Sequence, residues 1–205
     1  MKLYFVPRSR AERIAWLLEE LGLAYELEFF ASLTDPGLRS PKYLKMNLNG
    51  RVPTLQDGDT VISETGAIVQ YVLAKYAEGR LVPDMSSPEF AAYLQWLHYS
   101  EGMIMPPLGT IVVETVLLPP EKRSQVIADR AAKLLSRLLN AVNVALEGRD
   151  FLAGEFSGAD IMTGHACIMV SRIGTDFSDK PNVAAYIERL ISRPAFKRAA
   201  ALKKE

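Results

Sequence analysis

The stretch NGRVPTLQDGDTVISETGAI, residues 49–68, decides the fold because it combines a proline, a hairpin and a helix start. The segments PTLQD and TVIS flank Gly58, a pattern typical of a β-hairpin. Pro53 stands at the mouth of the first strand, a place where proline is tolerated because it has no N–H for the sheet ladder. From Ala67 onward apolar residues recur at helical spacing until Gly79. The stretch therefore predicts two antiparallel strands followed by a helix.

Before residue 49 the sequence pattern alternates between strand and helix. Residues 2–6, KLYFV, predict a strand, and residues 24–30, AYELEFF, predict another. Between them, apolar residues from Ala11 onward follow a 3.6-residue period, and Gly22 ends that helix as a C-cap. A strand–helix–strand order favours a right-handed βαβ unit. Residues 1–78 thus form a small α+β half.

Beyond residue 87 the pattern predicts only helices. PEFAAYLQWLHYSEGMIM is a long helix that Pro106 and Pro107 are expected to stop. LGTIVVETVLL fits a helix or a strand, and its helical neighbours favour a helix. The segment 121–148 is a strongly amphipathic helix. Its expected apolar side comprises Ile127, Ala131, Leu134, Leu135, Leu138, Val142 and Leu146.

One further helix start is marked by FSGADI. Ser157 can accept a hydrogen bond from the backbone N–H three residues on, and Asp160 can reach back to the Ser157 N–H. This is a capping box with Asp in place of Glu or Gln.

The bulk composition excludes several classes of protein. Lys and Arg number 24, as do Asp and Glu, so no global basic field exists to attract nucleic acid or an anionic membrane. The single cysteine, Cys167, allows no intrachain disulfide and fits a cytoplasmic location. The apolar stretch at the N-terminus is too short for a signal peptide, and no run approaches a membrane span. His98 and His165 are far apart in sequence, so no metal site is expected.

Four motifs together resemble the glutathione S-transferase family. GRVPTL resembles its proline loop, SETGAI its E-S-x-A-I motif with Thr65 in place of Ser, FSGADI its buried capping box, and SRPAFKRA its C-terminal segment. The start PRSRAERIAWLLEELGL looks most like bacterial and fungal members with a serine at the first helix. The resemblance covers essentially the whole chain. It implies a thioredoxin-like glutathione-binding domain at 1–78 and an all-helical domain at 87–205 on the second-substrate side.

The resemblance also implies how glutathione is held. The Val52–Pro53 peptide would be cis, and the backbone of Val52 would pair with the cysteinyl backbone of glutathione. The hydroxyl and N–H of Thr65 would bind the γ-glutamyl carboxylate, Glu64 the α-amino group, and Arg51 the glycyl carboxylate. From the residues alone, Glu64 and Thr65 can equally be a helix cap, and Arg51 a solvated surface residue.

The thiol chemistry would lie at the start of the first helix. From its residue type and position alone, Ser9 is expected to be a helix N-cap. The resemblance implies instead that its hydroxyl donates to the glutathione sulfur, where the positive potential of the helix N-terminus also favours the thiolate. Arg10 lies within reach of the same sulfur, and either residue can take this role. Tyr99 and Met103 are candidates for the second-substrate pocket, with a core position as the alternative reading.

Two functions follow as expectations. The first is a transferase that ionises the thiol of glutathione, its co-substrate, for attack on a hydrophobic electrophile, as in detoxification, with reduction of hydroperoxides as a further reaction. The second is a non-catalytic relative that keeps the fold as a binding or regulatory protein. The family is mostly homodimeric, so a homodimer is expected.

Overall fold

The computed structural model describes residues 1–203, and these residues divide into two compact units. The first unit combines Met1–Arg80 with the C-terminal segment from Ile191 onward, and the second spans Leu81–Leu190. Family domains at 1–78 and 87–205 remain a prediction, since packing alone groups the last helix with the first 80 residues. Within the described residues, no helix is long and apolar enough to cross a membrane.

The first unit is built on a four-stranded mixed sheet with the order β2-β1-β3-β4. Strands β1 and β2 run parallel, whereas β3 is antiparallel to both of its neighbours. This arrangement confirms the βαβ unit, the hairpin and the thioredoxin-like half. The elements are β1 (Lys2–Phe5), α1 (Ala11–Leu21), β2 (Glu26–Phe29), α2 (Pro41–Leu44), β3 (Thr54–Asp57), β4 (Thr60–Ser63), α3 (Thr65–Tyr76) and α9 (Pro194–Ala200).

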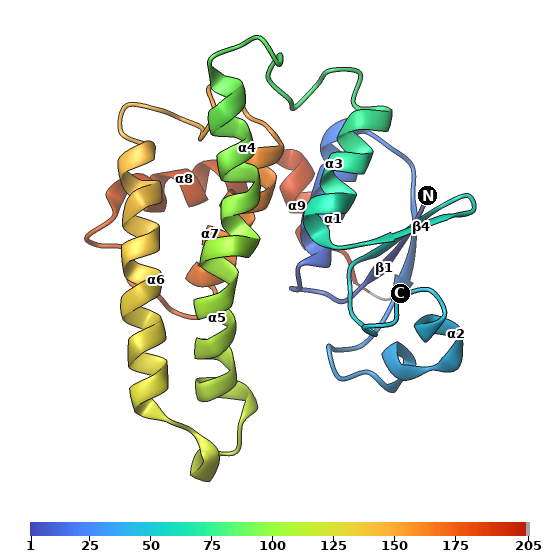
Figure 1. Cartoon of the computed structure of the whole chain (residues 1–205), viewed down its shortest axis with the longest axis horizontal. Coiled ribbons are helices and arrows are strands. Elements are labelled where there is room, and N and C mark those ends of the chain that lie inside the picture. The colour runs from blue at the N-terminus through green and yellow to red at the C-terminus, as the bar shows by residue number, and fades with distance from the viewer. Residues whose placement is uncertain (204–205) are drawn as a thin grey trace. The chain divides into compact units, whose positions relative to one another are not determined.

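Strand alternation explains how the helices cover this sheet (Figure 1). Leu3 and Phe5 of β1 are fully buried on one face, and α1 contacts both β1 and α3. Tyr4 points to the opposite face, where its ring lies 5.3 Å from that of Tyr43 in α2. Successive side chains of a strand face opposite sides, so one short strand supplies both hydrophobic layers.

The C-terminal helix α9 belongs to the first unit because it packs on α1. The rings of Trp16 and Phe196 lie 5.1 Å apart in an edge-to-face arrangement. Glu20 accepts two hydrogen bonds from the guanidinium of Arg193, at 2.6 and 2.9 Å. A bidentate pair of this kind fixes orientation as well as distance.

The second unit is helical, as expected from the sequence. Its elements are α4 (Glu89–Tyr99), α5 (Met105–Val112), α6 (Gln125–Ala145), α7 (His165–Ser171) and α8 (Pro181–Ser192), with π-helical turns at Ser100–Ile104, Val113–Leu117 and Asp160–Gly164.

The expectation that Pro106 and Pro107 stop a helix is wrong. The chain stays helical from α4 through the π turn at Ser100–Ile104 into α5, and both prolines occupy the first turn of α5. Proline has no backbone N–H to donate to the carbonyl four residues earlier in an α-helix. A π turn just before it uses hydrogen bonds between residues five apart, so the set of carbonyls that need a donor changes. The following segment is helical, as its neighbours indicated.

The expected apolar side of α6 is only partly correct. Ile127 and Leu134 are 46% and 39% exposed, whereas Ala128 and Leu139, which the expected set omitted, are buried. The packed stripe runs along Ala128, Ala131, Leu135, Leu139 and Val142. Apolar residues on the flank of a packed stripe remain at the surface, which single residues tolerate readily.

The capping box forms, with one change from expectation. Ser157 N–H donates to Asp160 Oδ2 at 2.9 Å as expected. The Ser157 hydroxyl accepts from the N–H of Ala159, two residues on rather than three, at 3.3 Å. The other oxygen of Asp160 accepts from the Leu152 N–H at 3.0 Å and the Tyr186 hydroxyl at 2.7 Å. One buried carboxylate therefore joins three separate segments of the second unit.

Candidate functional site

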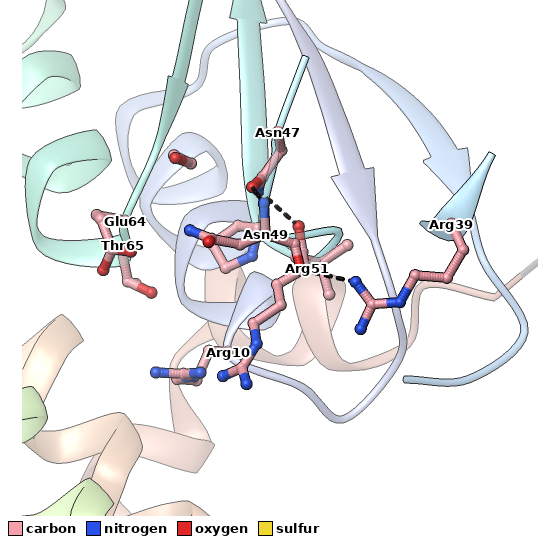
Figure 2. A pocket seen from close by; sticks show the side chains of 10 residues that line it. Arg10, Arg39, Asn47, Asn49, Arg51, Glu64 and Thr65 are labelled. Atoms are coloured by element: carbon pink, nitrogen blue, oxygen red, sulfur yellow. Dashed lines mark hydrogen bonds between the residues drawn. The ribbon is translucent and has the colours of Figure 1, made fainter. Parts of the chain in front are cut away.

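A cavity of about 440 Å³ opens in the first unit beside the proline loop (Figure 2). It lies between the start of α1, the segment that follows α2, and the junction of β4 with α3. Its lining comprises Arg10, Arg39, Asn47, Asn49, Arg51, Val52, Pro53, Ser63, Glu64 and Thr65.

The proline loop is held in place by buried polar groups behind it. The carbonyl of Arg51 accepts hydrogen bonds from Asn47 Nδ2 at 2.9 Å and from the Tyr43 hydroxyl at 2.6 Å. Asn47 Nδ2 also donates to Thr54 Oγ1 at 2.9 Å. Asn47, Tyr43 and Thr54 are all buried. Buried polar groups paired in this way specify one loop conformation, because leaving any of them unpaired is unfavourable.

The backbone of Val52 faces the cavity. The Val52–Pro53 peptide is cis, as the resemblance implies. Among residues 1–203, the hydrogen bonds leave both the N–H and the C=O of Val52 without a partner. An adjacent donor and acceptor of this kind can pair with the backbone of an extended peptide in the manner of an added strand.

Glu64 and Thr65 place a helix start on another side of the cavity. Glu64 precedes α3 and makes no side-chain capping bond. Its φ of 71° lies in the region that residues with a Cβ rarely adopt. The first N–H groups of a helix have no partner within it, and together with the helix dipole they attract an anion. A carboxylate beside them attracts a cation, so this corner suits the zwitterionic end of an amino acid.

Three arginines make the cavity strongly cationic. Arg10, Arg39 and Arg51 carry three positive charges against the single negative charge of Glu64 among the lining side chains. In Figure 2, Glu64 and Thr65 lie on one side, Arg39 lies on the other, and Arg10 and Arg51 lie between them. Guanidinium groups bind carboxylates with well-defined geometry, so the arrangement suits a peptide with more than one carboxylate.

Arg39 is positioned by the loop itself. Its Nη1 donates to the carbonyl of Asn49 at 2.8 Å. Gly50 has a φ of 55°, and a Cβ at that position would lie 2.6 Å from the carbonyl oxygen of Leu38. A glycine is therefore required where the chain turns beneath Arg39.

Ser9 and its neighbour Arg10 differ in their position relative to the cavity. The Ser9 hydroxyl is buried; it donates to the carbonyl of Val6 at 2.7 Å and accepts from the N–H of Ala11 at 3.1 Å. The Ser9 hydroxyl thus binds the first N–H of α1, although Arg10 occupies the N-cap position, and Ser9 is not among the lining residues. Arg10, its neighbour, does line the cavity.

Six of the residues singled out from the sequence meet in this cavity: Arg10, Arg51, Val52, Pro53, Glu64 and Thr65. Sequence reasoning missed Arg39, Asn47 and Ser63, and it gave no firm role to the remaining lining residue, Asn49. Ser63 directly precedes Glu64, so its inclusion needed only a wider window on the same motif. Arg39 ends a short 3-10 helix and Asn47 lies in the turn after α2, and segments this short carry no periodic pattern to mark which side chains turn inward.

Tyr99 and Met103 belong to the second unit. The hydroxyl of Tyr99 donates to the carbonyl of Leu138 at 3.0 Å, and its ring lies 4.8 Å from that of Trp96. Met103 is 44% exposed in the π turn that follows α4. A role in second-substrate binding remains a prediction for both residues.

Comparison with known families identifies the chain. The model of the glutathione S-transferase N-terminal domain matches residues 1–74, and the model of the C-terminal domain matches residues 104–194. The chain belongs to the glutathione S-transferase family. In this glutathione transferase, the cavity lies in the domain that the first model describes.

Curated relatives match over nearly the full length of this transferase. It is 32% identical to the probable glutathione S-transferase GSTF1 of Oryza sativa subsp. japonica, over 95% of this chain and 92% of the relative. It is 28% identical to glutathione S-transferase GstB of Escherichia coli (strain K12), over 93% and 92%.

Two solved structures of similar fold contain oxidised glutathione. A glutathione transferase from Pseudomonas putida, with one glutathione disulfide per subunit, superposes with a TM-score of 0.88 at 26% identity, over 99% of this chain and 91% of that one. The transferase URE2P8 from Phanerochaete chrysosporium, with oxidised glutathione, has a TM-score of 0.85 at 28% identity, over 97% and 92%.

Proposed function

We propose that glutathione binds in the cavity of the first unit as an extended peptide. Its γ-glutamyl carboxylate lies at the start of α3, against the hydroxyl and N–H of Thr65, and its α-amino group pairs with Glu64. Its cysteinyl backbone pairs with Val52, and its glycyl carboxylate is held by Arg51 with Arg39 beside it. This placement matches each charge of glutathione to an opposite charge or a helix start.

The observation that carries this proposal is the convergence of two binding elements on one hairpin. In the β3–β4 ladder Thr54 pairs with Ser63, so the residue after Pro53 and the residue before Glu64 are direct partners. The unpaired backbone of Val52 and the start of α3 therefore lie on either side of a single strand pair. A peptide that pairs with Val52 brings its neighbouring residue toward Thr65.

The thiol of a peptide bound in this way lies toward the start of α1. There the helix N-terminus and the guanidinium of Arg10 both favour the thiolate over the thiol, which lowers the thiol pKa. The Ser9 hydroxyl already donates to Val6, so it must rotate before it can donate to sulfur. We therefore expect Arg10 to contribute more than Ser9 to ionisation of the thiol.

The thiolate then serves as the nucleophile. It adds to an activated alkene, where a proton completes the product, or displaces halide from an aryl halide. With an organic hydroperoxide, two glutathione molecules give the alcohol, water and glutathione disulfide. The disulfide bound to the relatives from P. putida and P. chrysosporium supports the inclusion of this last reaction.

The test is a thiolate titration. Bound glutathione is followed by ultraviolet absorbance against pH in the parent protein and in Ser9→Ala, Arg10→Met and Arg10→Lys. We expect the pKa of the bound thiol to lie below that of free glutathione by about one unit or more. Arg10→Met should raise it most, Arg10→Lys should restore much of the shift, and Ser9→Ala should move it least.

Other outcomes would revise the proposal. A pKa that moves only in Ser9→Ala would make Ser9 the activating residue. If glutathione does not bind, the non-catalytic binding or regulatory protein becomes the better assignment. The homodimer, the cytoplasmic location and a role in detoxification remain predictions.

A further inference from the structure

At the hairpin end away from the cavity, a cluster of four side chains ties the sheet to α3. Oδ2 of Asp57, the last residue of β3, accepts hydrogen bonds from the Tyr71 hydroxyl at 2.7 Å, from Lys75 Nζ at 2.9 Å and from the Tyr76 hydroxyl. Lys75 also donates to the Tyr71 hydroxyl at 2.9 Å. These donors hold the pKa of Asp57 well below its ordinary value, so the carboxylate is ionised at neutral pH. We call these four residues the Asp57 cluster.

The Asp57 cluster closes a ring of three elements. Strand β3 runs from Thr54 to Asp57, β4 returns to Ser63, and α3 then leads back to Tyr76 beside Asp57. With 12 residues, α3 is about 18 Å long. The corner of the ring that lies farthest from the cluster is Glu64, the single residue between β4 and α3.

Glu64 is the corner at which the backbone is least favourable. Its φ of 71° and ψ of 117° lie outside the regions that a residue with a Cβ prefers. Its carbonyl still accepts the Ile68 N–H at 2.9 Å, so the helix begins directly after this unusual conformation. Such a backbone persists only where the surrounding structure enforces it.

We propose that the Asp57 cluster is a positioning device for the cavity. By holding the end of α3 against the hairpin turn, it fixes the angle between α3 and β4. It thereby keeps Glu64 in its positive-φ conformation, which aims the first N–H groups of α3 into the cavity. The effect on the ligand rests on the proposed glutathione site, whereas the effect on the Glu64 corner does not.

The cluster can be removed without removing the core of this unit. The inward face of α3, formed by Ile68, Val69, Val72 and Leu73, is buried and includes no member of the Asp57 cluster. Asp57→Asn removes the charge at nearly constant size, and Tyr71→Phe removes one donor only. Lys2→Met is the matched control, because it breaks a 2.7 Å ion pair with Glu28 on the other side of the same sheet.

The first measurement is calorimetric binding of glutathione, well below the melting temperature of each variant, together with steady-state kinetics. In Asp57→Asn we expect Kd and KM for glutathione to rise about tenfold, with kcat at saturation within about twofold of the parent. Tyr71→Phe should raise Kd less, and Lys2→Met should leave it unchanged. An Asp57→Asn protein that loses stability but keeps the parent Kd would reduce the cluster to a stabilising contact and overturn the proposal.

The second measurement is hydrogen exchange without ligand. If the cluster enforces the Glu64 corner, the amide of Ile68 exchanges faster in Asp57→Asn and at the parent rate in Lys2→Met. Unchanged exchange at Ile68 would overturn the proposal. If the parent protein fails to bind glutathione, the proposed function fails, and this exchange measurement still decides whether the cluster holds the corner.

Discussion

Two helix starts in this protein each combine a hydroxyl residue with a carboxylate, and they use them in opposite ways. At the helical segment after Ser157, the carboxylate of Asp160 is buried and accepts from Ser157, Leu152 and Tyr186. At the start of α3, Glu64 makes no capping bond and lines a cavity.

The difference indicates separate roles for the two helix starts. A carboxylate whose oxygens are all engaged by its own protein has nothing left to offer a ligand, so its contribution is to stability. A helix start that lacks a cap and has a disfavoured backbone gives up stability, and such sites concentrate where ligands bind. We therefore propose that Asp160 serves folding and Glu64 serves recognition, so variants of the two residues should affect different observables.

The largest effect is expected for Asp160→Ala. The change leaves the Leu152 N–H, the Ser157 N–H and the Tyr186 hydroxyl without their acceptor in the buried interior, which should lower the free energy of unfolding by about 3 kcal/mol. Urea unfolding measures this loss. Protein that remains folded should bind glutathione with the parent Kd. Equal unfolding midpoints for mutant and parent would contradict the stabilising role of Asp160.

A smaller effect, on binding rather than stability, is expected for Glu64→Ala. Loss of a charged hydrogen bond to the α-amino group should weaken glutathione binding by about 10- to 100-fold, measured by calorimetry. The melting temperature should stay within about 2 °C of the parent. Glu64→Gly is the control, because it tolerates positive φ and should gain stability while losing the same affinity. A large stability loss in Glu64→Ala with unchanged Kd would make Glu64 a structural cap.

The smallest effect concerns acid stability at Asp57, whose Oδ2 accepts three hydrogen bonds but which lies nearer the surface than Asp160. Its depressed pKa stabilises the folded protein fully above the unfolded-state pKa of about 3.9. This stabilisation is lost progressively as pH falls from that value to the much lower pKa of the folded state. At pH 7, Asp57→Asn should melt about 2–4 °C below the parent. The two melting curves should approach each other as pH falls below about 4 and should meet only below the folded-state pKa of Asp57. A gap that persists into acid would show that the carboxylate charge is not what stabilises the cluster.

Local features of the sequence were sufficient for most elements, and the family resemblance pointed to six of the ten residues that line the cavity. Periodicity predicts α1, α3 and α6, and the residues around Gly58 predict the β3–β4 hairpin, because each pattern reflects burial along one element. The motifs around Pro53 and Glu64 fall on consecutive elements, so their meeting at one cavity follows from the hairpin. The predicted end of a helix at Pro106 and Pro107 was wrong because a π turn, which has no sequence signature of its own, accommodates these prolines.

What the sequence by itself determined is therefore the order of elements, the family, and the two motifs that meet beside the hairpin. The tertiary structure decided which neighbour at the start of α1 faces the cavity, since the carbonyl of Val6 engages Ser9 and leaves Arg10 as a lining residue. It also decided that Arg39 and Asn47 join the cavity and that Asp57 is tied to the end of α3. The physical reason is that periodicity reports burial along one element, whereas the direction of a polar side chain depends on partners that only the folded chain brings within hydrogen-bond distance.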